Sequence, residues 1–344
     1  MLTCTWAPTV FAGMQMHGRA GAAHAAPRGA ALVEFVGAYA AKLEAAGITH
    51  LLVAQRWWGS GEEMEASSLD CLAMTTLFAA HTKKLQLVTA IHPGFFQPTA
   101  IAKWGATMDL ISGGRWSINV TSGWNLREFT MYGVDALDHD TRYARTAEFV
   151  ELLRGAWTHD AFSYRGRFYH AEDLRLQPRP AAPLTVFQGG QSDAAIALAA
   201  RHSDWMFLNG GSLERVTDII TQARAAAARQ GRSLRFAMHA NPLCRATDAE
   251  AWAEIAQRLA TLDPVMVQRR RAAVAGAEGM WRTEDDLSML DTNEGYAARL
   301  IGSPTTVLQR IREFAAVGVD MLHLTLGDAL FAQDVLPEIT DTRS

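Results

Sequence analysis

The side chains that could carry chemistry in this chain are mainly amides, hydroxyls and histidines at the ends of expected strands. The clearest example is the stretch 113–124, where Asn119 and Thr121 alternate with the β-branched residues Ile118 and Val120. This alternation is typical of a strand. Burying a polar side chain without a partner costs roughly 1–3 kcal/mol, so Asn119 and Thr121 need a partner or a ligand. A planar heterocycle that is hydrogen-bonded at its edges would suit them.

A turn that contains two glycines, from Gly189 to Asp193, stands between another expected strand and a helix. Such a turn exposes backbone N–H groups at the helix N-terminus, where an anion is stabilised. Ser192 could then hydrogen-bond a phosphate, or Ser192 or Asp193 could simply cap the helix. From spacing alone the cap is favoured, because such turns are common.

Arg142 and Tyr143 open the helix that follows the 113–124 stretch. Arg142 could fork onto a phosphate with the Tyr143 hydroxyl beside it, or it could pair with Asp138 or Asp140. Arg56, at another strand end, could bind a ligand anion, or it could pair with Glu62 or Glu63. The sequence alone leaves both choices open.

Several catalytic classes lack support in the sequence. The expected strand ends hold almost no carboxylates, which argues against glycoside hydrolysis by two carboxylates. Neither GxSxG nor HExxH occurs, so serine hydrolases and zincin metalloproteases lack their signatures. Asp138, His139 and Asp140 are adjacent and cannot converge on one ion in a regular element, so no metal site is expected.

Composition narrows the partners and the compartment. The formal net charge is -4 and the longest run of like charge is Arg269–Arg271, so no nucleic-acid partner is expected. No apolar run is long enough to suggest a membrane span. The three cysteines lie far apart and form no CxxC motif, which favours reduced thiols in a cytoplasmic protein.

Strand and helix signals alternate along the 344 residues. Alternation implies a parallel sheet, and eight strand–helix units imply an α/β fold of the (β/α)8 TIM-barrel type, with its active site at the carboxyl ends of the strands. A doubly wound open sheet is less favoured, because no GxGxxG follows the first strand. We expect one domain, 1–344, with an insertion at about 263–299 before the last strand–helix unit, helical and acting as a lid. The expected strands are 3–10, 49–53, 85–91, the 113–124 stretch, 184–187, 204–208, 234–243 and 318–324.

Several motifs together carry a resemblance to a known family. They are Thr89-Ala-Ile-His-Pro-Gly, Ser112-Gly-Gly-Arg-Trp-Ser-Ile-Asn-Val-Thr-Ser-Gly-Trp124, Asp138-His-Asp-Thr-Arg-Tyr143 and Gln188-Gly-Gly-Gln-Ser-Asp193. With them the chain resembles the bacterial-luciferase-like flavin monooxygenases, most closely the branch of dimethyl sulfone, alkanesulfonate and pyrimidine monooxygenases. The resemblance implies a luciferase-like barrel that uses FMN as FMNH2, delivered by a separate NAD(P)H-dependent flavin reductase, with O2 as co-substrate.

The resemblance also suggests roles for single residues. Arg142, Tyr143 and Ser192 match positions that hold FMN, the last near its phosphate and preceded by Gly190 and Gln191 of the turn. Asn119 and Glu128 match positions on the ring or ribityl side, and Gln55 and Arg56 match a pair that lines the flavin pocket. Thr89 and Asn119 match residues that flank oxygen beside the flavin in the pyrimidine branch.

The seventh strand departs from the family pattern. Alkanesulfonate enzymes place an Arg and a His there, where this chain has His239 and Asn241. Without the Arg an anionic sulfonate is less favoured. His239 could be a general acid or base, since an unshifted His titrates near pH ~6.5, or it could be a hydrogen-bonding residue of the barrel rim. We favour the catalytic role for His239, with Asn241 on the same strand face.

These observations predict a two-component monooxygenase that inserts one oxygen atom from O2 into a small organic substrate. An organosulfur compound such as a sulfone is the first choice, and a heterocycle or an electron-poor, for example halogenated, aromatic ring is the second. A flavin-binding protein without turnover and a deazaflavin-dependent reductase are the alternatives. By analogy with the family we expect a homodimer or homotetramer, to which Trp57 and Trp58 could contribute a contact.

Overall fold

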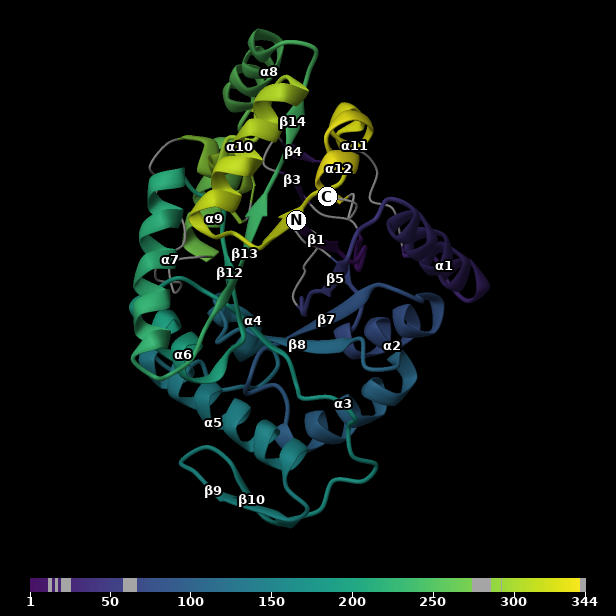
Figure 1. The fold of residues 1–344 in the computed structure, drawn as a ribbon, viewed down its shortest axis with the longest axis vertical. Helices are drawn as coiled ribbons and strands as arrows, with labels where there is room; N and C mark the ends of the chain where they lie inside the picture. The colour runs from purple at the N-terminus through teal and green to yellow at the C-terminus, as the bar shows by residue number, and fades with distance from the viewer. Residues whose placement is uncertain are drawn as a thin grey trace.

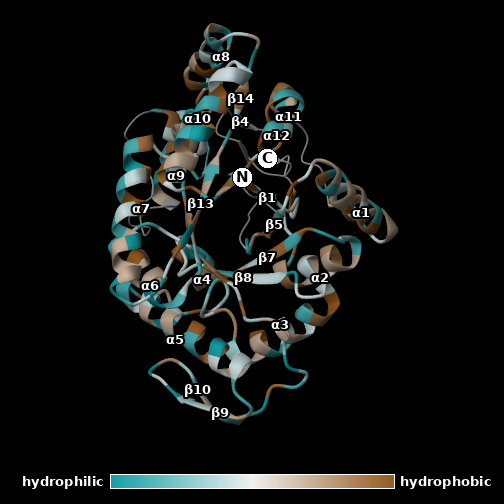
Figure 2. Cartoon of the chain, in the orientation of Figure 1, coloured by the Kyte–Doolittle hydropathy of each residue, from teal (hydrophilic) through white to brown (hydrophobic). Residues whose placement is uncertain are grey.

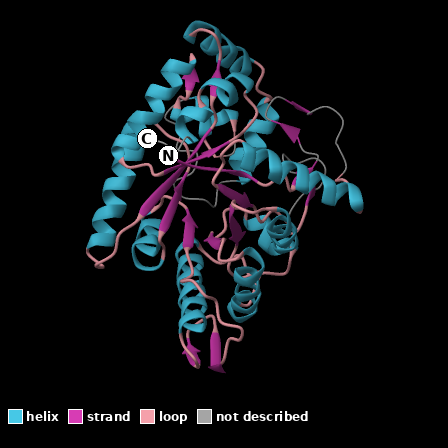
Figure 3. Ribbon diagram, turned by 45° about the vertical axis from the view of Figure 1, so that its right-hand side comes forward, coloured by secondary structure: helices cyan, strands magenta, loops and turns pink. Residues whose placement is uncertain are grey.

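Eight parallel strands close into a barrel in the computed structural model, which describes residues 1–11, 14–15, 18–19, 26–57, 67–273, 286–291 and 293–340. Neighbouring strands follow the order of the chain, and β1 closes the barrel against β16 with Leu2 opposite Met321. The strands run together through the middle of the molecule with helices around them (Figure 3). The barrel strands are β1 Leu2–Trp6, β5 His50–Val53, β7 Gln86–Ile91, β8 Trp116–Val120, β11 Val186–Gly189, β12 Trp205–Leu208, β13 Arg235–Ala240 and β16 Met321–Leu324.

The fold class predicted from the sequence is therefore confirmed, and the strand positions agree with it. The first and seventh expected strands end earlier than predicted. The first ends at Trp6, after which β2 (Val10–Phe11) pairs with β6 (Ser67–Ser68) outside the barrel. The seventh ends at Ala240, after which β14 (Leu243–Cys244) pairs with β15 (Ile301–Gly302). In each case the chain leaves the barrel and pairs with another segment beyond its carboxyl end.

Alternation along the strands separates two hydrophobic layers. One cluster takes residues from seven different barrel strands, which can meet only inside the barrel. A larger cluster joins the other faces of the strands to the helices. Figure 2 shows hydrophobic and hydrophilic segments on the same helices, as expected where one face packs on the barrel. The inner cluster consists of Cys4, Leu52, Val88, Ala90, Phe187, Trp205, Phe207, Ala237 and Met321.

Helices connect the barrel strands and lie around the outside of the barrel (Figure 1). The helices that follow barrel strands in this layer are α1 Ala30–Ala45, α2 Cys71–His81, α3 Pro98–Ser112, α5 His139–Thr158, α6 Asp193–His202, α7 Leu213–Ala228 and α10 Pro304–Val317. Shorter pieces are α4 Leu126–Met131, α11 Ala329–Asp334 and α12 Leu336–Thr340, with the two-stranded pairs β3 Met14–Gln15 with β4 Gly18–Arg19 and β9 Phe162–Arg165 with β10 His170–Leu174. None of the helices in the described ranges is long and apolar enough to cross a membrane.

The segment between β13 and α10 departs from simple alternation over a longer stretch than predicted. The parallel pair β14–β15 brackets it, and it contains α8 (Asp248–Ala260), α9 (Pro264–Ala273) and the short 3-10 helices η1 (Asp286–Leu290) and η2 (Gly295–Ala298). A separate apolar cluster joins α8 to η1 and to the β14–β15 pair. The described part of the expected insertion is helical. Its role as a lid stays a prediction, since residues 274–285 and 292 lie outside the described residues. Trp58, which was predicted to contribute to a subunit contact, also lies outside them.

Candidate functional site

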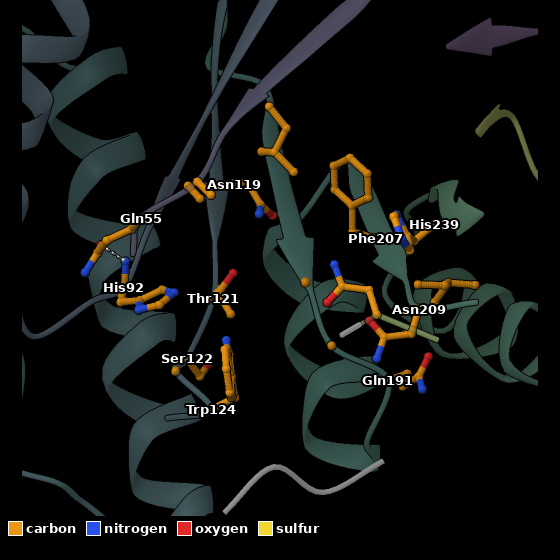
Figure 4. A pocket seen from close by; sticks show the side chains of 18 of the residues that line it. Gln55, His92, Asn119, Thr121, Ser122, Trp124, Gln191, Phe207, Asn209 and His239 are labelled. Atoms are coloured by element: carbon orange, nitrogen blue, oxygen red, sulfur yellow. Dashed lines mark hydrogen bonds between the residues drawn. The ribbon is translucent and has the colours of Figure 1, made fainter. Parts of the chain in front are cut away.

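A cavity of about 140 Å³ opens at the carboxyl ends of the barrel strands, where barrel enzymes carry their active sites. Figure 4 shows side chains from opposite walls facing one another across it. It brings together eight of the predicted site residues, which come from four different barrel strand ends and the start of α5: Gln55, Arg56, Asn119, Arg142, Tyr143, Gly190, Gln191 and His239.

Two amides in the wall of this cavity hold atoms that lack protein partners. Asn119 is 6% exposed, and its Oδ1 has no hydrogen-bond partner within the described part of the chain. Gln55 is fully buried; its Oε1 accepts from the His92 N–H at 2.8 Å, and its Nε2 has no such partner. The Asn119 oxygen is therefore available as an acceptor for a ligand in the cavity, whereas the Gln55 amide is directed away from the cavity, where it holds the His92 backbone (Figure 4).

Arg142 and Tyr143 come from the first turn of α5, which begins because Asp138 caps it by accepting from the Thr141 N–H at 2.9 Å. Arg142 is only 2% exposed and lines the cavity, and its Nη1 donates to the Leu137 carbonyl at 2.6 Å. Tyr143 lines the cavity beside His139, with ring centroids 4.8 Å apart. The guanidinium thus lies against the cavity wall. Hydrogen bonds from Thr141 and, to a smaller extent, the charge of Arg142 lower the pKa of Asp138, one of the two partners that the sequence left open.

The turn before α6 shows the predicted helix cap. Ser192 Oγ accepts from the Ala195 N–H at 3.3 Å and lies 3.4 Å from Nε2 of His139. Ser192 itself is 8% exposed and is not among the cavity-lining residues, whereas Gly190 and Gln191 are. Gly190 has a φ of 129°, and a Cβ at this position would lie 2.8 Å from the Tyr143 hydroxyl. Glycine therefore allows the turn to approach the start of α5 closely.

Glu128 is not among the residues that line the cavity, and its expected place on the ring or ribityl side stays a prediction. Its Oε1 accepts from the Trp57 N–H at 2.7 Å, and its Oε2 lies 3.5 Å from Nδ1 of His92. Burial alone would raise the pKa of Glu128, but the hydrogen bond and charge of His92, the Trp57 N–H and the charge of Arg56 lower it overall. The carboxylate positions His92 and Arg56, both of which line the cavity.

Thr89 is likewise not among the residues that line the cavity, and its expected position beside oxygen stays a prediction. Its hydroxyl accepts from Trp116 Nε1 at 3.0 Å and shares a 2.9 Å hydrogen bond with Thr75 of α2. Alternation along β7 explains this placement, because the neighbouring Ala90 lines the cavity while Thr89 faces the helix layer.

His239 lies where the first cavity meets a second one of about 310 Å³, to which Asn241 contributes. Nδ1 of His239 and Nδ1 of His323 are 3.0 Å apart, and Nε2 of His239 is 3.7 Å from Oδ1 of Asp291. Burial lowers the pKa of His239, and the charge of Asp291 offsets part of this shift. Burial, followed by the charge of His239, lowers the pKa of His323 well below its usual value.

Sequence reasoning did not assign roles to His92, His323, Asp291 or Asn209, which line one cavity or the other. His92, His323 and Asn209 were visible as polar residues at strand ends, a signal that they share with the other rim residues. Asp291 had no such signal, because it reaches the rim from the segment that follows α9.

A (β/α)8 barrel with a polar cavity at the carboxyl ends of its strands has the architecture of an enzyme. The sequence profile of the luciferase-like monooxygenases matches residues 9–321, and the chain belongs to that family. An FMNH2-dependent dimethylsulfone monooxygenase of Pseudomonas fluorescens is 37% identical over 312 residues, which cover 87% of this chain and 85% of the relative. Its counterpart in Pseudomonas putida is 36% identical over 286 residues, with 79% of each chain covered.

Solved structures agree on the fold. A riboflavin lyase crystallised with modified FMN and riboflavin superimposes with a TM-score of 0.78 at 20% identity, covering 98% of this chain and 91% of its own. DmoA from Hyphomicrobium sulfonivorans superimposes with a TM-score of 0.75 at 20% identity, covering 98% and 87%. At such identities the likeness concerns the fold alone, and the predicted luciferase-like barrel is confirmed.

Proposed function

We propose that this chain is an FMNH2-dependent monooxygenase that inserts one oxygen atom of O2 into a small neutral organosulfur compound, with dimethyl sulfone as the first choice. The similarity to two dimethylsulfone monooxygenases over most of the chain supports the substrate class. Reduced flavin is then supplied by a separate NAD(P)H-dependent flavin reductase.

The observation that carries the proposal is an unpartnered amide oxygen in the cavity wall. Oδ1 of Asn119 offers an acceptor that is buried and has no partner among the described residues. The isoalloxazine ring of FMN presents an N–H group at its edge, which fits this acceptor. When bound, FMN supplies the redox chemistry, and the protein contributes binding, orientation and exclusion of water.

The phosphate end of FMN has a candidate position at the start of α5 and α6. Arg142 and Tyr143 from α5 line the cavity next to Gly190 and Gln191 at the N-terminus of α6. A guanidinium group and a helix N-terminus both stabilise a phosphate. Ser192 Oγ lies 3.4 Å from Nε2 of His139, which lines the cavity. We propose that Ser192 also contacts the phosphate.

A neutral substrate is our choice for the second cavity. This cavity is lined by Arg56 and Asp291, whose charges are opposite, and by Asn241, whose Oδ1 has no hydrogen-bond partner among the described residues. The attraction of Arg56 for a sulfonate anion is opposed by the Asp291 carboxylate, so the lining has no excess positive charge to hold an anion. We keep the roles proposed for His239 and Asn241 as groups that face the substrate.

We infer the cellular compartment from the cysteines and the oligomeric state from the family. Cys4, Cys71 and Cys244 are buried and form no disulfides, which suits the reducing cytoplasm. A homodimer or homotetramer remains our expectation by analogy with the family.

The direct test combines the purified protein with NADH, FMN, a flavin reductase, dimethyl sulfone and oxygen gas labelled with 18-oxygen. We expect one labelled atom in the oxidised product by mass spectrometry and faster turnover of the sulfone than of methanesulfonate. Product without label, or consumption of reduced flavin that no organosulfur compound alters, would count against the proposal. A titration with the deazaflavin cofactor in place of FMN separates the reductase alternative.

A further inference from the structure

Two imidazoles share one hydrogen bond where the two cavities meet. His239 of β13 and His323 of β16 are partners in the barrel register, and their Nδ1 atoms are 3.0 Å apart. Both side chains are nearly fully buried, at 5% and 1% exposure. One of the two Nδ1 atoms must carry the hydrogen and the other must accept it, since two N–H groups or two lone pairs would repel.

The neutral pair carries a second hydrogen, which can reside on Nε2 of either ring. The carboxylate of Asp291 lies 3.7 Å from Nε2 of His239, an electrostatic contact that favours an N–H at that atom. His323 must then donate from Nδ1, and its own Nε2 is left with a lone pair. The relation is that of a triad, in which a carboxylate fixes the tautomer of a histidine.

Asp291 is held in place by the segment that carries it. Its carboxylate accepts from the backbone N–H groups of Asn293, Gly295 and Tyr296 at 2.9, 3.0 and 3.2 Å. This segment is in turn attached to the barrel rim, because the Gly295 carbonyl accepts from the Asn241 N–H at 3.2 Å. The position of the carboxylate is therefore built into the fold.

Nε2 of His323 is buried and has no hydrogen-bond partner among the residues that the structure describes, although His323 lines the cavity. We propose that Nε2 of His323 is the proton-accepting atom of this site and that Asp291 is the positioning residue that selects this tautomer through His239. His323 resembles the other polar rim residues in the sequence, and only the contact of Asp291 with His239 distinguishes it from them.

The proton balance of the pair is simple. Uptake of one proton at Nε2 of His323 gives a cation with a hydrogen on each Nε2 and one in the shared Nδ1 bond, and the charge faces Asp291 through His239. Release from the same atom restores the neutral pair. In the proposed reaction, on which this step rests, one oxygen atom of O2 enters the product and the other leaves as water with the two hydrogens of FMNH2. Protons are therefore passed within the cavity and no net proton is consumed.

Burial and aromatic neighbours favour the neutral form of the His239–His323 pair. The ring of Trp6 meets His323 edge-on with centroids 4.3 Å apart, and Phe207 lies at 5.7 Å. Burial lowers the pKa of both histidines, so neither carries charge at neutral pH. The other charged or titratable groups that line the two cavities are Arg56, His92, His139, Arg142 and Tyr143.

The tautomers can be measured without cofactor or substrate. Nitrogen-15 NMR of protein labelled at the histidine rings distinguishes N–H from unprotonated nitrogen, and the His323→Asn and His239→Asn variants assign the signals. We expect His323 protonated at Nδ1 and bare at Nε2, and His239 protonated at Nε2. The opposite tautomers in the wild-type protein would overturn the proposal, whether or not a sulfone is the substrate.

Asp291→Asn tests the positioning role, and Asp286→Asn, an exposed acid of the same segment, is the matched control. In Asp291→Asn the ring signals should shift toward a mixture of both tautomers. The kcat of Asp291→Asn should fall by about 10-fold, less than the roughly 10²–10⁴-fold expected for loss of a general acid or base. Its pH profile should also move, while FMN affinity stays unchanged. Unaltered tautomers in Asp291→Asn, or equal losses in the two variants, would refute it.

Discussion

Histidines are buried near both ends of the barrel, and their surroundings differ. His50 is the first residue of β5, at the amino end, while His239 and His323 lie toward the carboxyl ends of β13 and β16. His50 lies between aromatic neighbours, with its ring centroid 6.2 Å from Phe187 and 6.5 Å from Trp205. Burial, together with the charge of Arg235, lowers the pKa of His50 to about 4.

The lowered pKa is thus common to both ends and does not by itself mark a functional site. The difference lies in hydrogen bonding. Nδ1 of His50 is 2.8 Å from the Thr49 hydroxyl, a local partner in the preceding residue. At the other end, His239 of the histidine pair lies next to the Asp291 carboxylate. Nε2 of His323 has no hydrogen-bond partner among the described residues, and His323 lines a cavity. A perturbed group becomes a candidate for catalysis when its polar atoms also face open space that a ligand can fill.

The largest expected effect comes from removing an imidazole at each end in turn. His323→Asn should lower kcat by about 10²–10⁴-fold, because it removes the proposed proton acceptor. His50→Asn, a matched substitution at the closed end, should leave kcat unchanged and alter only stability. Steady-state kinetics with dimethyl sulfone, on variants shown to be folded by circular dichroism, provides the measurement. Equal losses of kcat in the two variants would remove the functional distinction between the ends.

A second contrast concerns the arginines of the two ends. Arg142 lines the cavity, while Arg235 at the closed end stacks 4.0 Å over the Trp205 ring. Arg142→Met should weaken FMN binding by about 10–100-fold, since a charge-assisted hydrogen bond contributes about 1.5–3 kcal/mol. Arg235→Met should leave the affinity unchanged. Fluorescence titration with FMN measures both, and tight binding by Arg142→Met would place the phosphate elsewhere.

Much of this arrangement could be predicted from the sequence, because strand alternation and turn residues act locally. The alternation around Asn119 separated that amide from Ile118 and Val120, and the amide does lie on the inner face. The same alternation places Thr89 on the outer face, where the resemblance to the family had suggested an inner one. A shift of one residue along a strand reverses the direction of its side chains.

Other features could not be read from local patterns. Asp291 reaches the histidine pair from a segment some fifty residues beyond β13, and only the folded chain shows that contact. Glu128 is close to the cavity in the sequence motif, yet its carboxylate is directed to the Trp57 N–H and to His92 behind the wall. Side-chain direction in a loop depends on partners that are distant in the sequence. The resemblance therefore indicated which residues lie near the site, but not where their side chains point.

The smallest expected effect contrasts a polar group that faces the cavity with one that faces the helices. Asn119→Leu removes a buried oxygen that has no hydrogen-bond partner in the described ranges, so we expect the flavin-free protein to gain about 1 kcal/mol of stability while FMN affinity falls about 10-fold. Thr89→Val leaves the N–H of Trp116 without its acceptor, so it should lose about 1–3 kcal/mol with FMN affinity unchanged.

The opposite signs make this pair informative even though each change is modest. Urea unfolding of the flavin-free variants gives the stability differences, and FMN titration gives the affinities. A binding group left without a protein partner costs stability until its ligand arrives, whereas a structural group contributes to stability with or without ligand. If Asn119→Leu proved less stable than the wild type, its amide would serve the fold, and the assignment of this wall to the flavin edge would fail with it.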